Sequence, residues 1–325
     1  MLATRNGAAT LPGVLEAYCR LDPPRGGWSL VVVDNGSTDS SQQIITGFEN
    51  RLPLTYVVEP KAGKNAALNT GLAFVSGDLV LLTDDDAFPR PDWLVRLRDA
   101  ADANPTVGIF GGAVVPRWEV APPPWLFDGV PLAWTYTVSD PSLTEGAIGG
   151  RQIFGPNMAV RASIFDAGHR FDPSIGPNGS RSYAMGSETE FVLRVMGNGV
   201  SAWYLPNAIV DHYVRARQMR RSWIIGRMMR AGRCDCRIYL EYPAACQWYW
   251  GFRRPPNLTH RCFGIPLTLV YQLVRRAAVV LLAVPRFRKK NVFRSIWILS
   301  YLYGFAFEAR IANGKTAAVA RGEYL

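Results

Sequence analysis

The chain has 325 residues, 48% hydrophobic and 19% charged, which is ample for one large core or two domains, and it contains no repeats or low-complexity tracts. Residues 1–210 hold 15 Lys and Arg against 21 Asp and Glu, whereas residues 211–325 hold 21 against 5. This basic, aromatic-rich C-terminal part indicates an anionic partner, either nucleic acid or a lipid surface. The five cysteines lack zinc-site spacing and indicate free thiols in a reducing compartment.

Residues 1–112 alternate between patterns typical of strands and of helices. Only two or three residues precede the polar turn at Thr4–Gly7, so we expect a shortened, apparently truncated first strand. The alternation predicts an α/β fold with a mostly parallel, Rossmann-like sheet and helices on both faces. We expect strands at 28–33, 54–58, 79–82 and 107–112, and helices at 11–19, 40–50, 63–77 and from Pro91 onward.

The pattern dissolves from Pro116 to Gly150, and we interpret this stretch as a long excursion or lid. Regular elements return after it, and the composition shifts again beyond His212. We therefore predict a first domain at 1–215 and a basic, apolar helical region at 216–325. In the first domain we expect strands at 154–160 and 200–205, helices at 161–167 and 188–196, and a loop at 175–186.

Three consecutive carboxylates follow the apolar run Leu79–Leu82. Because unpaired buried charge is very costly, the strand should end where the acids begin, at the carboxyl edge of a sheet. Ligands bind at that edge in open α/β folds. In an extended segment Asp84 and Asp86 point to the same side, so the pair is suited to a divalent cation, which can hold a diphosphate. An acidic surface turn is the alternative for such a triplet taken alone.

Further polar residues fall at predicted strand ends of the same sheet: Thr4–Asn6, Asp34, Lys64 and His212. Glu188 opens a helix after a flexible loop. Each has a structural explanation by itself, such as a turn, a core histidine or a helix cap. Together they indicate a site for a nucleotide, its diphosphate and a metal, with one carboxylate left for proton transfer.

Seven stretches in a fixed order, which cover about residues 1–215, carry a resemblance to a known family. They are Thr4–Asn6, Val31–Asp39, Gly63–Asn69, Leu82–Asp86, Gly155–Ala159, Glu188–Phe191 and Tyr204–His212. In these stretches the sequence resembles the inverting family 2 glycosyltransferases, which have the GT-A nucleotide-diphospho-sugar transferase fold.

The resemblance implies how a nucleoside-diphosphate sugar donor is held. Asp34 is expected to contact the base, with Thr4 and Asn6 nearby. Lys64 is expected to compensate for an arginine that many relatives carry near the nucleotide. Asn157, within one of the matching stretches, is expected to bind substrate.

The resemblance also implies the catalytic groups. Asp84 is expected to contact the ribose or the metal, and Asp86 to bind Mg²⁺ or Mn²⁺ directly. His212 resembles the family's late metal or diphosphate ligand, and Glu188 occupies the position of the catalytic base. One base opposite the leaving group implies a single displacement with inversion, in which the metal offsets charge on the departing nucleoside diphosphate.

The leading hypothesis is an inverting glycosyltransferase at the cytoplasmic face of the cell membrane, acting on a glycan or lipid-linked acceptor in polysaccharide or glycolipid assembly. A non-catalytic relative that binds a nucleotide sugar or glycan is the alternative. Its support is the short first strand and Ser187-Glu188, where the family usually has Glu-Asp. A nucleotidyltransferase needs a Gly-rich, Arg-containing loop after the first strand, which Thr4–Gly7 matches poorly.

The C-terminal region contains two apolar stretches, 263–284 and 292–307, separated by the basic run 286–290. Crossing a bilayer with the first stretch would place Arg275-Arg276 in mid-membrane, which is costly. We therefore predict basic amphipathic helices on an anionic membrane surface. We expect no nucleic acid partner, because the basic residues interleave with apolar runs. The alternative is an ordinary helical subdomain with a solvated basic face.

Overall fold

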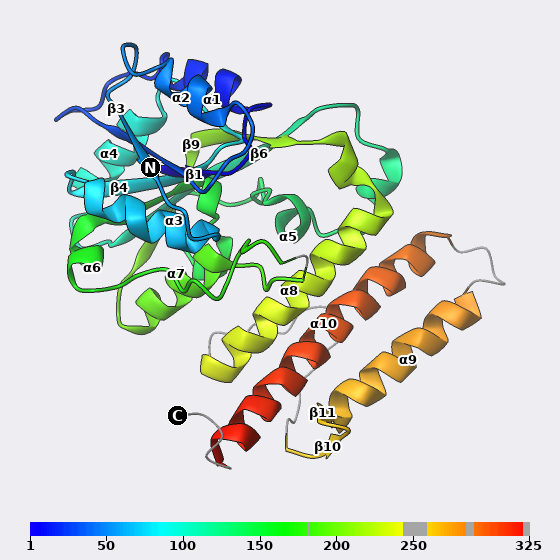
Figure 1. The fold of residues 1–325 in the computed structure, drawn as a ribbon. Helices are drawn as coiled ribbons and strands as arrows, with labels where there is room; N and C mark the ends of the chain where they lie inside the picture. The colour runs from blue at the N-terminus through cyan, green and yellow to red at the C-terminus, as the bar shows by residue number, and fades with distance from the viewer. Residues whose placement is uncertain (181, 243–258, 284–288, 321–325) are drawn as a thin grey trace. The chain divides into compact units, whose positions relative to one another are not determined.

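The computed structural model describes residues 1–180, 182–242, 259–283 and 289–320. The chain forms two compact units, which are described separately (Figure 1). Along the sequence, we propose two domains, 1–215 and 216–325. The first unit comprises 1–119, 136–181 and 187–214, and the second comprises 120–135, 182–186 and 215–325.

The first unit is built on a nine-stranded sheet of order β3-β2-β1-β4-β8-β6-β9-β5, with β7 paired to β9. The strands from β3 to β4 run parallel, as do β6 and β9, whereas β8, β5 and β7 run antiparallel to their partners. This arrangement confirms the predicted α/β class. The strands are β1 (Leu2–Thr4), β2 (Leu30–Asp34), β3 (Leu54–Val58), β4 (Leu79–Asp84), β5 (Ala87–Pro89), β6 (Ile109–Trp118), β7 (Gly146–Ala147), β8 (Met158–Arg161) and β9 (Ala202–Val214).

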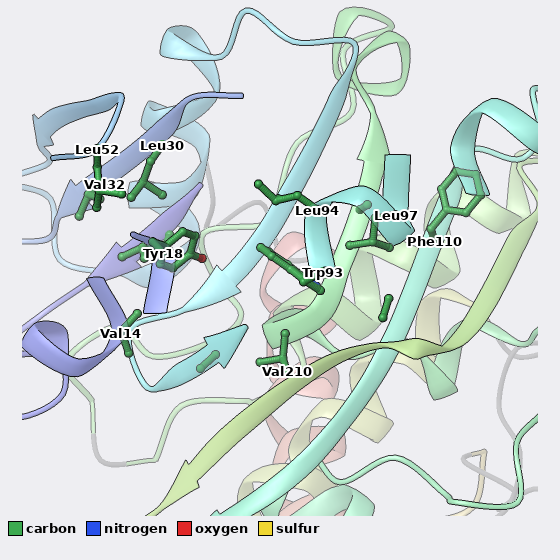
Figure 2. Close-up of a cluster of buried hydrophobic side chains, with 14 of the residues drawn as sticks. Val14, Tyr18, Leu30, Val32, Leu52, Trp93, Leu94, Leu97, Phe110 and Val210 are labelled. Atoms are coloured by element: carbon green, nitrogen blue, oxygen red, sulfur yellow. The ribbon is translucent and has the colours of Figure 1, made fainter. Parts of the chain in front are cut away.

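Helices cover both faces of the sheet. Because every second residue of a strand points to the same side, an apolar strand presents apolar side chains to both layers of helices. On β2, Leu30 and Val32 belong to one core, drawn in Figure 2, whereas Val31 and Val33 belong to the other. A strand buried on both faces therefore reads as a continuous apolar run. The first core is lined by α1 (Leu11–Tyr18), α2 (Ser41–Thr46) and α4 (Trp93–Ala103), and the second by α3 (Lys64–Gly71), α6 (Ala162–Asp166) and α7 (Ser187–Gly197).

The long strands β6 and β9 correct the expected element boundaries. They pair along their lengths, with a register shift at Gly112/Ala113, so β6 continues to Trp118 into the expected lid. The expected strand at 200–205 likewise continues to Val214. The rest of the expected lid contains the 3-10 turn η2 (Pro124–Leu126), α5 (Leu132–Tyr136) and β7. Such pairing joins segments about ninety residues apart, so a local pattern does not reveal it.

The second unit consists mainly of α8 (Arg221–Glu241), α9 (Leu267–Ala283) and α10 (Lys289–Ala320), with the hairpin β10 (Arg261–Cys262) and β11 (Ile265–Pro266) before α9. α8 lies beside α10, and α9 lies along α10 (Figure 1). Gly232 and Gly304 allow α8 and α10 to approach closely, because a Cβ on either would overlap a backbone carbonyl of the other helix. Within the described residues, no helix combines the length and the apolarity needed to cross a bilayer.

The expectation of surface-lying helices is corrected for residues 292–307. Trp297, Tyr301 and Phe305 on α10 are buried, and the Tyr301 hydroxyl donates to Asp235 of α8 at 2.6 Å. α10 is therefore a core helix of the second unit. Packing within the second unit explains the apolar character of these three positions, whereas Tyr303 and Phe307 of the same stretch are exposed.

Candidate active site

Two aspartates end parallel strands of the first unit, Asp34 on β2 and Asp84 on β4, with β1 between the two strands. After Asp84 the chain turns through two further aspartates into β5. The antiparallel pairing of β5 with β9 sets Ala87 opposite His212, so His212 comes beside Asp86. The sheet thus gathers residues that are far apart in the sequence at its carboxyl edge, as the apolar-to-acidic boundary after Leu82 predicts.

Asp84, Asp86 and His212 form a group whose ligand atoms all lie within 4.8 Å of one another. Nδ1 of His212 lies 2.9 Å from the carbonyl oxygen of Tyr136, which can only accept, so Nδ1 carries a proton and Nε2 faces Oδ1 of Asp86 at 3.3 Å. Burial alone would lower the pKa of His212, but the nearby Asp86 carboxylate outweighs it and raises that pKa. Two carboxylates and one imidazole fit a divalent cation such as Mg²⁺ or Mn²⁺.

Lys64, near the start of α3, joins this group to Glu188. Its ammonium lies 2.5 Å from Oδ1 of Asp84 and 2.6 Å from Oε1 of Glu188. Burial alone would lower the pKa of Lys64, yet the two carboxylates raise it, so the lysine stays protonated. Burial alone would raise the pKa of Glu188, yet the Lys64 ammonium lowers it. Glu188 is therefore held ionised and able to accept a proton.

Glu188 is also positioned by its own surroundings in the first turn of α7. The Ser187 hydroxyl donates to Oε2 of Glu188 at 2.9 Å. Gly155 leaves the space that Glu188 fills, because a Cβ there would lie 2.5 Å from Cδ and Oε1 of the glutamate. Glu190 takes a different partner and pairs with Arg194 at 2.7 Å.

Asp34, expected near the nucleotide base, is almost fully buried at the end of β2. Its Oδ1 accepts from the backbone N–H of Ser37 at 2.8 Å, and its Oδ2 accepts from the Tyr56 hydroxyl at 3.0 Å. Burial, together with Asp34, raises the pKa of Tyr56 to about 12. Asp34 is thereby fixed in orientation, with further lone pairs left for a ligand.

Thr4 and Asn6 lie at the adjoining end of β1. The Thr4 hydroxyl donates to the Asp85 carboxylate, which directs this middle aspartate of the triplet back into the fold. Asn6 has a positive φ of 56°, a conformation that asparagine tolerates, and its Oδ1 accepts from the backbone N–H of Thr38 at 2.8 Å. The structure thus brings Thr4, Asn6 and Asp34 together on one side of the acidic group.

Asn157 is not brought to this group. It is fully buried, its Nδ2 donates to the carbonyls of Ala113 and Ala208 at 2.8 Å, and its Oδ1 accepts from the Trp93 indole at 2.8 Å. These bonds hold the register shift of β6 against β9. The expectation that Asn157 binds substrate is therefore not carried forward, because its amide is engaged within the core.

Several contributing residues were not assigned from the sequence. Ser187 and Gly155 support Glu188, and both lie beside or within the matching stretches, so their positions carried a signal. Tyr56 orients Asp34 from the neighbouring strand, and Tyr136 orients His212 through a backbone carbonyl. Any residue can supply a backbone carbonyl, so the sequence does not reveal this contact between residues 76 positions apart.

Comparison with known proteins agrees with this geometry. Residues 1–144 match the family model described as Glycosyl transferase family 2. This part of the chain is therefore similar to the family 2 glycosyltransferases. Its curated relatives include a glucosyl-dolichyl phosphate glucuronosyltransferase of Haloferax volcanii, 25% identical over 218 residues that cover 66% of this chain and 69% of the relative. A beta-monoglucosyldiacylglycerol synthase of Synechocystis is 34% identical over 112 residues, 33% of this chain and 23% of the relative.

Comparison with solved structures supports the GT-A fold. A mannosyltransferase, PcManGT, from Pyrobaculum calidifontis, determined with GDP-Man and Mn²⁺, aligns over 95% of this chain and 85% of its own, with a TM-score of 0.58 and 21% identity. Residues 1–349 of TarS from S. aureus align over 99% of this chain and 91% of theirs, with a TM-score of 0.52 and 15% identity. At these identities the likeness establishes the fold.

Proposed function

We propose that this family 2 glycosyltransferase moves a sugar from a nucleoside diphosphate to an acceptor hydroxyl with inversion at the anomeric carbon. The observation that carries the proposal is the ion pair of Glu188 with Lys64, which joins this carboxylate to Asp84 at the acidic group. A base beside a diphosphate site is the arrangement that a single displacement needs.

In the proposed reaction, Glu188 takes the proton from the acceptor hydroxyl as its oxygen attacks the anomeric carbon. The bond from that carbon to the diphosphate oxygen breaks on the opposite face, and its electron pair leaves with the nucleoside diphosphate. Lys64 keeps Glu188 ionised until the acceptor arrives and holds it in place. Thr4, Asn6 and Asp34 bind the nucleoside.

Asp84, Asp86 and His212 are the residues that would hold Mg²⁺ or Mn²⁺. A bound divalent cation would offset the negative charge that develops on the departing diphosphate. The Tyr136 carbonyl presents Nε2 of His212 to this site, and the Asp85 carboxylate is kept out of it by Thr4. The chain therefore provides three metal ligands and holds a fourth carboxylate, that of Asp85, away from them.

The acceptor is proposed to be lipid-linked or a glycan. The support comes from the relatives, which are named for transfer to a dolichyl phosphate sugar and for synthesis of a glucosyl diacylglycerol. An acceptor of this kind would place the enzyme at the cytoplasmic face of the cell membrane. Its products would enter glycolipid or polysaccharide assembly.

Incubating the full chain with a panel of nucleoside-diphosphate sugars, Mn²⁺ and lipid-linked or glycan acceptors tests this function. Release of nucleoside diphosphate with a product of inverted anomeric configuration is expected. Donor binding without any release, across the panel, would favour a non-catalytic sugar-nucleotide binder, for which Ser187-Glu188 in place of Glu-Asp is the specific support. A product of retained configuration would refute the single displacement.

A further inference from the structure

An exposed apolar stripe runs along α9. Its members Leu267, Tyr271, Val274, Leu281 and Leu282 are between 48% and 72% exposed. At about 100° per residue, these five positions fall within an arc of about 100° on one side of the helix. They therefore form one continuous face, called the α9 face here.

The opposite side of α9 is apolar as well. Leu269 is fully buried, and Leu273 and Val280 are half-buried where the helix packs along α10 (Figure 1). A helix with apolar residues on opposite sides is normally covered on both, and an isolated protein in water rarely exposes such a stripe. Within the described part of the chain, nothing covers the α9 face.

A second exposed aromatic group precedes the helix. Phe263 sits at the tip of the β10–β11 hairpin and is 90% exposed. Its φ is +50°, followed by +77° at Gly264, so a two-residue turn holds a phenylalanine in the left-handed region. A bulky residue in that conformation is strained, and strain of this kind is concentrated at functional positions.

Arg275 borders the α9 face, about 20° around the helix from Leu282. Arg276 lies on the opposite side of α9, near Arg294 of α10. None of them pairs with a carboxylate among the residues that the structure describes. Burial, and then the charges of Arg275 and Arg294, lower the pKa of Arg276. Among the residues that the structure describes, positive charge is therefore concentrated around α9 without a paired counter-charge.

We propose that the α9 face and Phe263 dock on an anionic lipid membrane, with the apolar side chains at the acyl boundary and Arg275, at the edge of the face, at the headgroup phosphates, while Arg276 and Arg294 add positive charge nearby. Apolar residues flanked by unpaired cations match that surface in both chemistry and charge. A second copy of this chain fits less well. In a two-fold dimer the same patch meets itself, so the two copies would bring like charges at its edge together. The proposal does not rest on the chemistry of the first unit.

Flotation of the full chain with vesicles tests the proposal, using phosphatidylcholine alone and phosphatidylcholine mixed with phosphatidylglycerol. The double variant Tyr271→Ser/Leu281→Ser removes apolar groups from the α9 face without opening a cavity, and its partitioning onto the anionic vesicles should fall by about tenfold or more. Phe74→Ser/Val120→Ser is the matched control, because these side chains are also about half exposed but lie elsewhere. Equal partitioning of the two double variants would overturn the proposal.

The charge variant Arg275→Gln/Arg294→Gln tests the second half of the claim. It should lose most of the preference for anionic over neutral vesicles, and added salt should have the same effect on the unmodified chain. Sedimentation without lipid, which measures the oligomeric state, completes the test on the unmodified chain and on the Tyr271→Ser/Leu281→Ser and Arg275→Gln/Arg294→Gln variants. A dimer of the unmodified chain that the Tyr271→Ser/Leu281→Ser change dissociates, with vesicle binding unaltered, would assign the α9 face to a second copy instead.

Discussion

Replacing Gly155 by alanine should displace Glu188, the proposed catalytic base, from the rest of the site. The added Cβ would lie 2.5 Å from Cδ and Oε1 of Glu188, whereas ordinary contact begins at 3.4 Å. The carboxylate must therefore move by about 1 Å. A displacement of that size costs on the order of a hundredfold in rate, or about 2.7 kcal/mol of transition-state stabilisation.

The assay is kcat for nucleoside diphosphate release, with donor affinity and the thermal unfolding midpoint measured on the same protein. Gly155→Ala should lower kcat by about a hundredfold and leave donor affinity within about twofold. Gly197→Ala is the control on α7, the helix of Glu188, because a Cβ there meets nothing within 4 Å. If Gly155→Ala retained the kcat of the unmodified enzyme, the position assigned to Glu188 would be refuted.

Three further predictions follow from the same contacts. Glu188→Gln should lower kcat at least about a hundredfold with donor binding nearly unchanged. Glu190→Gln, which weakens the buried pair with Arg194, should mainly lower the unfolding midpoint. The reverse ranking of the two variants in kcat would contradict the assignment of the base. Asp86→Ala should abolish metal-dependent turnover without unfolding the protein, and full activity of this variant in EDTA would rule out the metal site. Gly232→Ala should lower the free energy of unfolding by about 1–3 kcal/mol through overlap with α10. Gly226→Ala, on the same helix but without such overlap, should raise it by about 0.5–1 kcal/mol. Denaturant titration measures both changes, and equal changes for the two variants would count against the close helix crossing.

The candidate site was predictable where residue type and strand ends coincide. The run from Leu79 into Asp84 predicts both a buried strand and its end, since apolar residues and unpaired charges cannot share one environment. Asn157 shows the limit of this reasoning. Its place within a matching stretch was interpreted as substrate binding, yet its amide bonds hold β6 and β9 in the core.

The helical region shows the same limit for packing. The stretches at 263–284 and 292–307 are both predominantly apolar, and the sequence predicts a surface-lying helix for both. The fold separates them, because α10 buries Trp297, Tyr301 and Phe305 while α9 leaves one face exposed. The residue types of a segment determine how apolar it is, but the neighbouring helices determine which of its faces stay exposed to solvent.

The sequence by itself determined the α/β class, the acidic edge of the sheet and the identity of the charged groups, because these depend on local periodicity and on the cost of burying charge. Tertiary structure alone decided which of these groups meet. Lys64 bridges Asp84 and Glu188, and the β5–β9 register sets His212 beside Asp86. The physical reason is that the pairing and register of segments far apart in the chain depend on the packing of the whole sheet, which no local stretch of sequence contains.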